Sequence, residues 1–260
     1  MFIVNIILKT SYHAVFSSVK KNRTMWSKNH DYTIMKNMKY IRDPGFRCFQ
    51  RSFMIRNVVF DMGNVIIRFD PSFFISREGI EDLADRELIM NELFLSVEWA
   101  QMDSGVLTEE TAEPSILSRF PDRLKGIVHN LLFSWADPPV PVPGMEDLVR
   151  RLKKAGYGVW LLSNASKAQH LYWPKVPVSG LFDGKLVSCD TGYVKPMREI
   201  YLAFTDKYQL LPEECVFIDD SIQNVAGAVA CNWHGIVFHG SSEELEQKLN
   251  RLGVILSPAG

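Results

Sequence analysis

Three short apolar runs, each followed directly by polar side chains, constrain the fold more than any other feature of the sequence. The runs and their polar residues are Val58 to Phe60 with Asp61, Val159 to Leu162 with Ser163 and Asn164, and Val216 to Ile218 with Asp219 and Asp220. A segment that is apolar at every position is typical of a parallel strand with both faces buried. Open parallel sheets place their chemistry just beyond the carboxyl ends of such strands. We therefore expect these polar groups to meet at one edge of a single sheet.

Strand-like and helix-like segments alternate from Met54 onward, which predicts an α/β fold with a doubly wound, Rossmann-like parallel sheet. Weaker strands are expected at Lys185 to Ser188 and at Ile236 to Phe238. The helical patterns are found at Met145 to Leu152, at Glu199 to Tyr208, at Val225 to Cys231, and after the capping pair Ser241 and Glu244.

The stretch from about Pro71 to Pro138 has helix-type spacing of its apolar residues and contains no convincing strand. We interpret it as a small α-helical cap inserted after the first strand, so that residues 54–70 and 138–260 form the core domain and residues 71–137 the cap domain. Residues 137–144 contain four prolines and are expected to be a stiff linker back to the core. Substrate choice is expected to depend on a closing loop at residues 99–105, with a plain helix–helix turn as the alternative. Its candidate contact residues are Trp99, Met102 and Asp103.

Residues 1–53 differ from the rest of the chain in charge. They contain ten Lys or Arg and two Asp or Glu, a net charge of +8, whereas the remainder carries 19 basic and 28 acidic residues, a net charge of −9. We interpret residues 1–53 as a basic N-terminal arm that is disordered or not native, with Met54 as the functional start. A targeting presequence and a polyanion-binding arm are the alternatives.

Composition and spacing exclude several functional classes. The total net charge of −1 indicates no nucleic-acid or membrane partner, and the only apolar run near the N-terminus is too short to span a bilayer. The four cysteines show neither metal nor disulfide spacing, which favours a cytoplasmic location. No Ser/His/Asp triad, phosphate-binding glycine loop or dinucleotide fingerprint is present. The sequence leaves the oligomeric state open.

The polar residues at the strand ends are suited to phosphoryl transfer. Asp61 is a candidate nucleophile, with a turn-forming Asp as the alternative. Asp219 and Asp220 place two like charges side by side, which a divalent cation such as Mg²⁺ would relieve, unless they form a solvated helix cap. Lys195, in an extended segment before Pro196, is a candidate for stabilising the charge of a transferred phosphoryl group.

Four motifs together resemble those of the haloacid dehalogenase superfamily. They are Phe60 to Val65, Leu162 to Asn164, Val194-Lys195-Pro196 and Phe217 to Asp220. The resemblance covers about residues 54–254, and the helical insert is similar to the small α-helical cap of that family. The first motif, together with Trp173-Pro174 and Asp219-Asp220, is most similar to the sugar-phosphate phosphatase branch that includes bacterial α-D-glucose-1-phosphate phosphatase. The phosphatase domain of soluble epoxide hydrolase is a further relative.

The resemblance implies a role for each motif residue. Asp61 would attack phosphorus and ligate Mg²⁺, together with the Gly63 carbonyl and Asp220, and with Asp219 in or near the ligand shell. The phosphate would be bound by Ser163 and Asn164, and Lys195 would orient Asp61 and the phosphoryl oxygens. The implied reaction is Mg²⁺-dependent hydrolysis of a small phosphorylated metabolite, a sugar phosphate such as glucose 1-phosphate, through an aspartyl-phosphate.

One position departs from most phosphatases of the superfamily, which carry a second Asp as general acid two residues after the nucleophile. Here that residue is Gly63, which has no side chain to move a proton. Two alternatives therefore stay open. One is a metal-free 2-haloacid dehalogenase, and the other is a non-catalytic phosphate-binding protein on the same fold.

Overall fold

A computed structural model of the chain describes residues 54–256. The expected basic arm, residues 1–53, lies outside the described residues. Within the described part, no helix is both long enough and apolar enough to cross a membrane.

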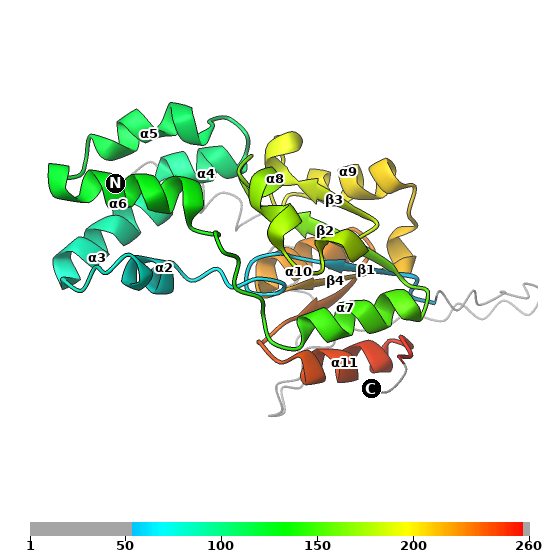
Figure 1. Ribbon diagram of the computed structural model, residues 1–260. Coiled ribbons are helices and arrows are strands. Elements are labelled where there is room, and N and C mark those ends of the chain that lie inside the picture. The colour runs from blue at the N-terminus through cyan, green and yellow to red at the C-terminus, as the bar shows by residue number, and fades with distance from the viewer. Residues whose placement is uncertain (1–53, 257–260) are drawn as a thin grey trace, which may run out of the picture. The chain divides into compact units, whose positions relative to one another are not determined.

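Five parallel strands form one sheet in the order β3-β2-β1-β4-β5 (Figure 1). The strand bounds are Asn57–Phe60 for β1, Gly158–Ser163 for β2, Gly184–Val187 for β3, Cys215–Asp219 for β4 and His234–Val237 for β5. In the register of the sheet, Phe60 lies opposite Leu161 on one side and Ile218 on the other. The residues that follow these three positions therefore start level with one another at the carboxyl edge.

The first and last of the three apolar runs are central strands, and every residue of β1 and β4 is buried. The side chains of β1 alternate between two hydrophobic clusters, with Val58 and Phe60 in one and Val59 in the other. A strand whose two faces both pack against helices must be apolar throughout, which explains the unbroken runs.

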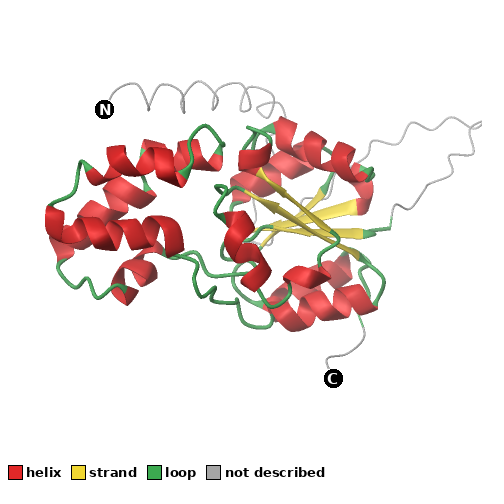
Figure 2. Cartoon of the chain, turned by 45° about the horizontal axis from the view of Figure 1, so that its top comes forward, coloured by secondary structure: helices red, strands yellow, loops and turns green. Residues whose placement is uncertain are grey.

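Helices cover both faces of the sheet, as expected of a doubly wound fold (Figure 2). The helix α7, Met145–Lys154, and the helix α11, Ser242–Arg251, contribute to the cluster that contains Val58. The helix α9, Arg198–Tyr208, and the helix α10, Ile222–Ala230, contribute to the cluster that contains Val59. The α/β class with a parallel sheet and a helical insert is confirmed.

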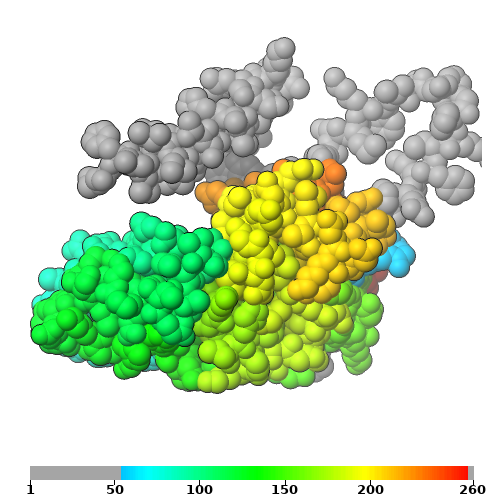
Figure 3. All heavy atoms as spheres, turned by 90° about the horizontal axis from the view of Figure 1, so that it is seen from above, coloured from blue at the N-terminus to red at the C-terminus, as the bar shows by residue number. Residues whose placement is uncertain are grey.

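Between β1 and β2 the described chain is helical. The insert consists of α2, Pro71–Arg77, α3, Leu83–Ile89, the π-helical η1, Met90–Phe94, α4, Val97–Asp103, α5, Glu109–Leu117, and α6, Asp122–Ser134. Four of these helices begin after a capping residue whose side-chain oxygen accepts a backbone N–H of the first turn. The capping residues are Asp70, Asp82, Ser96 and Thr108. Figure 3 shows the insert, cyan to green, against the yellow part of the core. The exact bounds of the insert as a separate domain, residues 71–137, stay a prediction.

The two segments that join the insert to the core run side by side. Ile67 forms an antiparallel bridge with Pro141. The N–H of Arg68 donates to the carbonyl of Val140 at 2.8 Å, and the N–H of Val142 donates to that of Ile66 at 2.9 Å. The chain therefore leaves the core and returns to it through one hydrogen-bonded pair of segments.

The remaining short elements lie near the carboxyl edge or connect the strands. They are α8, Gln169–Tyr172, and the 3₁₀ turns η2, Trp173–Lys175, η3, Ser179–Leu181, η4, Ser188–Asp190, and η5, Pro212–Glu214.

Three local expectations need correction. The last strand begins two residues earlier than expected, at His234, because an edge strand tolerates polar and small residues that a central strand would not. Residues 99–103 lie within α4 rather than in a loop, since the Ser96 hydroxyl accepts the N–H of Trp99 and starts the helix there. Ser241 does accept the N–H of Glu244, but the Glu244 carboxylate pairs with Lys248 instead of closing a capping box.

Candidate active site

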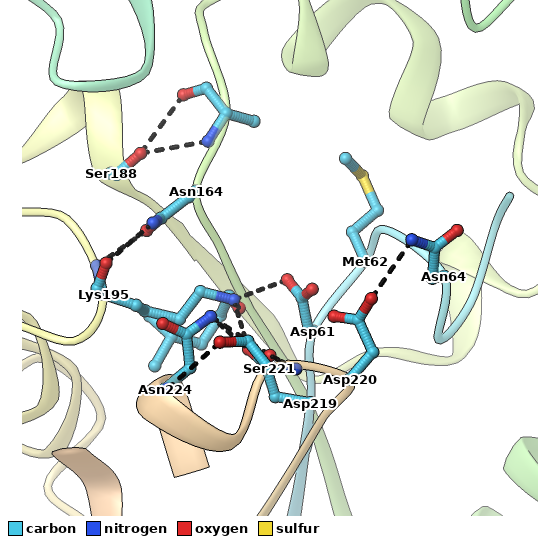
Figure 4. A network of polar contacts seen from close by, with 12 residues as sticks. Asp61, Met62, Asn64, Asn164, Ser188, Lys195, Asp219, Asp220, Ser221 and Asn224 are labelled. Atoms are coloured by element: carbon cyan, nitrogen blue, oxygen red, sulfur yellow. Dashed lines mark hydrogen bonds and ion pairs between the residues drawn. The ribbon is translucent and has the colours of Figure 1, made fainter. Parts of the chain in front are cut away.

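Three carboxylates converge at the carboxyl edge of the sheet. Asp61 follows β1, Asp219 ends β4, and Asp220 comes next in the chain. One oxygen from each of the three lies within 4.8 Å of the others (Figure 4). The expected convergence is therefore found, and it follows from the register that sets β1 beside β4.

Lys195 lies among these carboxylates with its side chain almost entirely buried. Its Nζ donates to Asp61 Oδ1 at 2.6 Å, to Asp219 Oδ2 at 2.8 Å and to the carbonyl of Leu162 at 3.1 Å. Burial disfavours the charged ammonium, but the two carboxylates more than offset this, so the pKa of Lys195 lies above its ordinary value. Burial also raises the pKa of Asp61, against the opposing attraction of Lys195.

Asp219 and Asp220 have different surroundings although they are adjacent. Asp219 is fully buried, and besides Lys195 it accepts hydrogen bonds from the N–H of Ser221 at 2.8 Å and from Asn224 Nδ2 at 3.0 and 3.1 Å. Asp220 instead lines a cavity, as Asp61 does, and accepts a bond from Asn64 Nδ2 at 3.1 Å. Asp219 thus binds Lys195 without lining the cavity. Asp61 and Asp220 do line the cavity, which is the open side of the site.

The segment after β2 is joined to the segment that carries Lys195. Asn164 Nδ2 donates to the carbonyl of Lys195 at 3.0 Å, and the N–H of Lys195 donates to Asn164 Oδ1 at 2.8 Å. Asn164 lines the cavity, together with Ser166. Ser163 is buried in β2 and does not line the cavity, so the structure brings Asn164, but not Ser163, to the open side.

The cavity has a volume of about 190 Å³ and is bounded by both the core and the insert. Aromatic rings form part of its lining, at Phe69, Trp99, Trp135 and Tyr172. The ring centroid of Trp135 lies 5.0 Å from that of Phe69 and 5.2 Å from that of Tyr172. The lining of the cavity therefore combines carboxylates at the sheet edge with a group of aromatic rings.

The three residues expected to contact substrate from the insert have different positions on α4. Trp99 and Asp103, one helical turn apart, both line the cavity. Met102 is 2% exposed and packs in the hydrophobic core. Gly63 also lines the cavity, beside Asp61.

Two asparagines contribute to the site. The sequence indicates Asn64 only as a member of the first motif, and it does not single out Asn224. Asn64 has a left-handed backbone, φ 55°, which asparagine tolerates better than most residues, and its Oδ1 accepts the N–H of Phe69 at 3.0 Å. Asn224 lies in the first turn of α10, whose start Ser221 caps. The sequence did contain a signal for Asn224. Ser221, which follows Asp219 and Asp220, is a typical helix cap, and it places Asn224 in the first turn, where Nδ2 donates to Asp219.

Curated proteins that resemble this chain include hydrolases of phosphate esters. The chain is 24% identical to flavin mononucleotide hydrolase 1 of Arabidopsis thaliana over 94% of this chain and 95% of that protein. It is 26% identical to sesquiterpene phosphatase astK of Aspergillus oryzae over 68% of this chain and 87% of that protein. It is 25% identical to drimenol cyclase drtB of Aspergillus calidoustus over 79% of this chain, a match that spans only 38% of the cyclase.

Solved structures and a family model agree on the fold. A predicted HAD-like hydrolase from Porphyromonas gingivalis is 25% identical, with a TM-score of 0.58 over 76% of this chain and 98% of that one. A HAD family enzyme from Bacteroides thetaiotaomicron, solved with magnesium and inorganic phosphate, is 22% identical, with a TM-score of 0.55 over 74% and 98%. The model of the haloacid dehalogenase-like hydrolases matches residues 55–232. With this match over most of its length, and with the four motifs gathered at one sheet edge, the chain belongs to the haloacid dehalogenase-like hydrolases.

Proposed function

We propose that this hydrolase is a Mg²⁺-dependent phosphatase of phosphomonoesters that works through an aspartyl-phosphate. The observation that carries the proposal is the placement of Asp61 and Asp220 on the open side of the site, with the Lys195 ammonium 2.6 Å from Asp61. This arrangement combines a nucleophilic carboxylate, a second carboxylate and a buried cation at one cavity.

The donor set fits Mg²⁺, which prefers oxygen ligands and uses few carboxylates. Asp61, Asp220 and the Gly63 carbonyl would hold the ion, since Asp219 already accepts bonds from Lys195, Ser221 and Asn224. When bound, Mg²⁺ would neutralise charge on the phosphoryl oxygens.

The chain's own residues supply the remaining steps. The Asp61 oxygen attacks phosphorus and forms the aspartyl-phosphate, and water then cleaves it. Lys195, held by Asp61, Asp219 and Leu162, stays charged and stabilises the phosphoryl oxygens. Asn164 and the backbone that follows it bind the phosphate. The two hydrogen bonds between the Asn164 side chain and the Lys195 backbone fix the separation of these two residues.

The substrate that we propose is a small phosphorylated metabolite whose leaving group has an apolar or flat face. The aromatic residues Trp99, Trp135 and Tyr172 support this, because ring faces stack on sugar C–H groups, on other rings and on isoprenoid chains. A sugar phosphate such as glucose 1-phosphate fits this description. So do the compounds for which two relatives are named, flavin mononucleotide and a sesquiterpene phosphate. A turnover screen of these three classes with Mg²⁺ distinguishes them.

A metal-free 2-haloacid dehalogenase would use the same nucleophile on carbon. The three converging carboxylates favour the phosphatase, because they offer oxygen ligands to a cation, for which displacement at carbon has no role. Chelation separates the reactions. EDTA should stop the phosphatase, and full turnover in EDTA would exclude the mechanism proposed here.

The decisive test is hydrolysis of p-nitrophenyl phosphate, whose leaving group needs no acid. We expect Mg²⁺-dependent turnover by the wild-type protein and a loss of at least about 10³-fold in Asp61→Asn, because an amide cannot form the acyl-phosphate. Asp122→Asn, a change of an exposed carboxylate on α6, should leave turnover unchanged and serves as the control. A wild-type protein that binds phosphate without turning over this ester would point to the non-catalytic alternative.

We also propose a cytoplasmic location. Cys189, Cys215 and Cys231 are free and buried in the described part of the chain, as suits a reducing compartment. Imaging of a fluorescent fusion that keeps residues 1–53 tests this against a targeting presequence. Import into an organelle would contradict it.

A further inference from the structure

The proposed phosphatase reaction needs a proton donor that the first motif does not supply. A strongly basic alkoxide leaves phosphorus readily only if its oxygen is protonated as the bond breaks, and a positioned acid typically contributes about 10²–10⁴-fold. The side chain that could donate this proton two residues after Asp61 is missing, because that residue is Gly63.

Asp103 lines the same cavity, and it belongs to the insert rather than to the core. It ends α4 and lines the cavity that Asp61, Asp220 and Lys195 line from the core. Its carboxyl group has no hydrogen-bond or ion-pair partner within residues 54–256, whereas most other acidic groups at the site have one. The Asp103 carboxyl group is therefore available to a group bound in this cavity.

The backbone around Asp103 is fixed to the core. Ser188 Oγ donates to the Asp103 carbonyl at 2.5 Å and accepts the N–H of Ala165 at 3.0 Å. Gly105 has a left-handed backbone, φ 74°, and packs so closely on the carbonyl of Cys189 that a Cβ would overlap it. The main chain of Asp103 is thus held against the core, while its carboxyl group keeps its hydrogen-bonding capacity for a ligand.

The surroundings of Asp103 favour its protonated form. Burial, and then the negative charge of Glu109, raise the pKa of Asp103 to about 7, against the opposing effect of Lys195. Glu109 is fixed in turn, since its Oε1 accepts bonds from the Ser166 hydroxyl and the N–H of Ala168. Tyr172 stays neutral, because burial raises its pKa well above the ordinary value.

We propose that Asp103 is the general acid of the reaction, a role that rests on the proposed phosphatase activity. The Asp61 oxygen forms a bond to phosphorus, and the bond from phosphorus to the leaving oxygen breaks with its electron pair going to that oxygen. The Asp103 proton passes to the same oxygen, so that an alcohol leaves. The Asp103 carboxylate then takes a proton from the water that attacks the aspartyl-phosphate, which releases inorganic phosphate and restores both aspartates.

The test compares two esters of similar size that differ in leaving group. p-Nitrophenyl phosphate releases a stable phenolate, and cyclohexylmethyl phosphate releases an alkoxide that needs a proton. We expect Asp103→Asn to lower kcat/KM for cyclohexylmethyl phosphate by about 10²-fold or more and for p-nitrophenyl phosphate by less than about threefold. Retained turnover of the aryl ester shows that the variant is folded and binds Mg²⁺.

Other outcomes are equally decisive. Equal losses on both esters would make Asp103 a structural residue and overturn the proposal. A wild-type protein that hydrolyses only the aryl ester would also overturn it, since the site would then lack an effective acid. If the wild-type protein hydrolyses neither ester, the proposed phosphatase function itself fails. Asp122→Asn on the insert surface is the matched control and should alter neither ratio.

A pH profile gives a second readout. For cyclohexylmethyl phosphate, wild-type kcat/KM should fall on the alkaline side as Asp103 loses its proton, and this limb should be absent in Asp103→Asn. The charged and titratable groups that interact with Asp103 come from other elements: Glu109 of α5, Tyr172 of α8, and Lys195, while Asp61 lines the same cavity. Glu109→Gln removes a negative charge that raises the pKa of Asp103, so it should shift the alkaline fall in kcat/KM to lower pH. If Asp103→Asn kept the same alkaline fall as the wild-type protein, the assignment of Asp103 as general acid would be contradicted.

Discussion

Lys195 is the residue on which the arrangement of acidic groups depends. Its ammonium lies between Asp61 and Asp219, and its side chain is 1% exposed. Buried carboxylates without a cation repel each other and lose their hydration, so this one cation stabilises the site before any ligand binds.

We predict that Lys195→Met lowers the free energy of unfolding by about 3–5 kcal/mol, because it leaves two buried carboxylates unpaired. Mg²⁺ should restore part of this loss, since a bound cation stabilises the folded state. Urea denaturation with and without Mg²⁺ measures both effects.

The matched control is Lys175→Met, which removes an exposed pair with Asp137 whose side chains are 53% and 48% exposed. Exposed pairs contribute little, so the change should be below about 1 kcal/mol and insensitive to Mg²⁺. If both variants lost a similar free energy of unfolding, the burial of Lys195 would not increase its contribution to stability.

At the residue scale, the sequence predicted those site residues whose position is set by a strand end. Asp61, Asp219 and Asp220 converge because they follow buried strands of one sheet. It could not predict which way a side chain points. Ser163, the last residue of β2, is buried and does not line the cavity, and Met102 packs in the hydrophobic core although its neighbour Asp103 lines the cavity. These orientations depend on strand register and helix phase, which packing determines.

Among the elements, α4 carries two of the insert residues that line the cavity, Trp99 and Asp103, and an ion pair joins it to the end of α5. Arg119 donates to both carboxylate oxygens of Glu98, at 2.8 and 3.0 Å, and its Nε lies 2.7 Å from Glu92 Oε2. The hydrogen bonds from Arg119 lower the pKa of Glu98 to about 2. A bidentate pair of this kind fixes orientation as well as distance.

We predict that Glu98→Gln lowers stability at neutral pH by about 1 kcal/mol, a value reduced for the partial solvent exposure of the pair. Because the folded-state pKa is depressed, the pair's contribution is fully present above the ordinary pKa of 4.5 and is lost as pH falls toward 2. Unfolding free energies measured between pH 7 and pH 3 should therefore converge for the two proteins. A constant difference over this range would contradict the ion-pair explanation.

The elements themselves could be predicted in kind but not in every bound. Unbroken apolar runs identified the central strands, whereas the edge strand β5 includes His234 and Gly235 and was placed too late. The order of strands could not be predicted, because apolar runs show that a strand is buried without showing which strand lies beside it. Residues 99–103 were expected in a loop because the capping signal of Ser96 was overlooked.

For the whole molecule, residues 54–256 contain the five-stranded sheet and the two hydrophobic clusters described above. We predict that a protein starting at Met54 keeps its melting temperature and its turnover of p-nitrophenyl phosphate. Differential scanning calorimetry and the Mg²⁺-dependent assay check this. A lower melting temperature or lost turnover would show that residues 1–53 stabilise the fold.

The class of the fold was predictable because alternating strands and helices leave few arrangements, and the helical insert was predictable from its change of period. Asp103 was expected to contact substrate from the insert, and it does line the cavity. The burial of its carboxyl group and the nearby charge of Glu109, which together raise its pKa, are properties of the folded chain that the sequence could not predict.

The hydrogen-bonded pair of segments at Ile67 and Pro141 has an evolutionary consequence. Since the chain exits and re-enters the core at adjacent points, a different insert can be grafted there without stretching the sheet or closing a long loop. Lineages that share the core can thus exchange this module and acquire new substrates while Asp61 and Lys195 remain untouched.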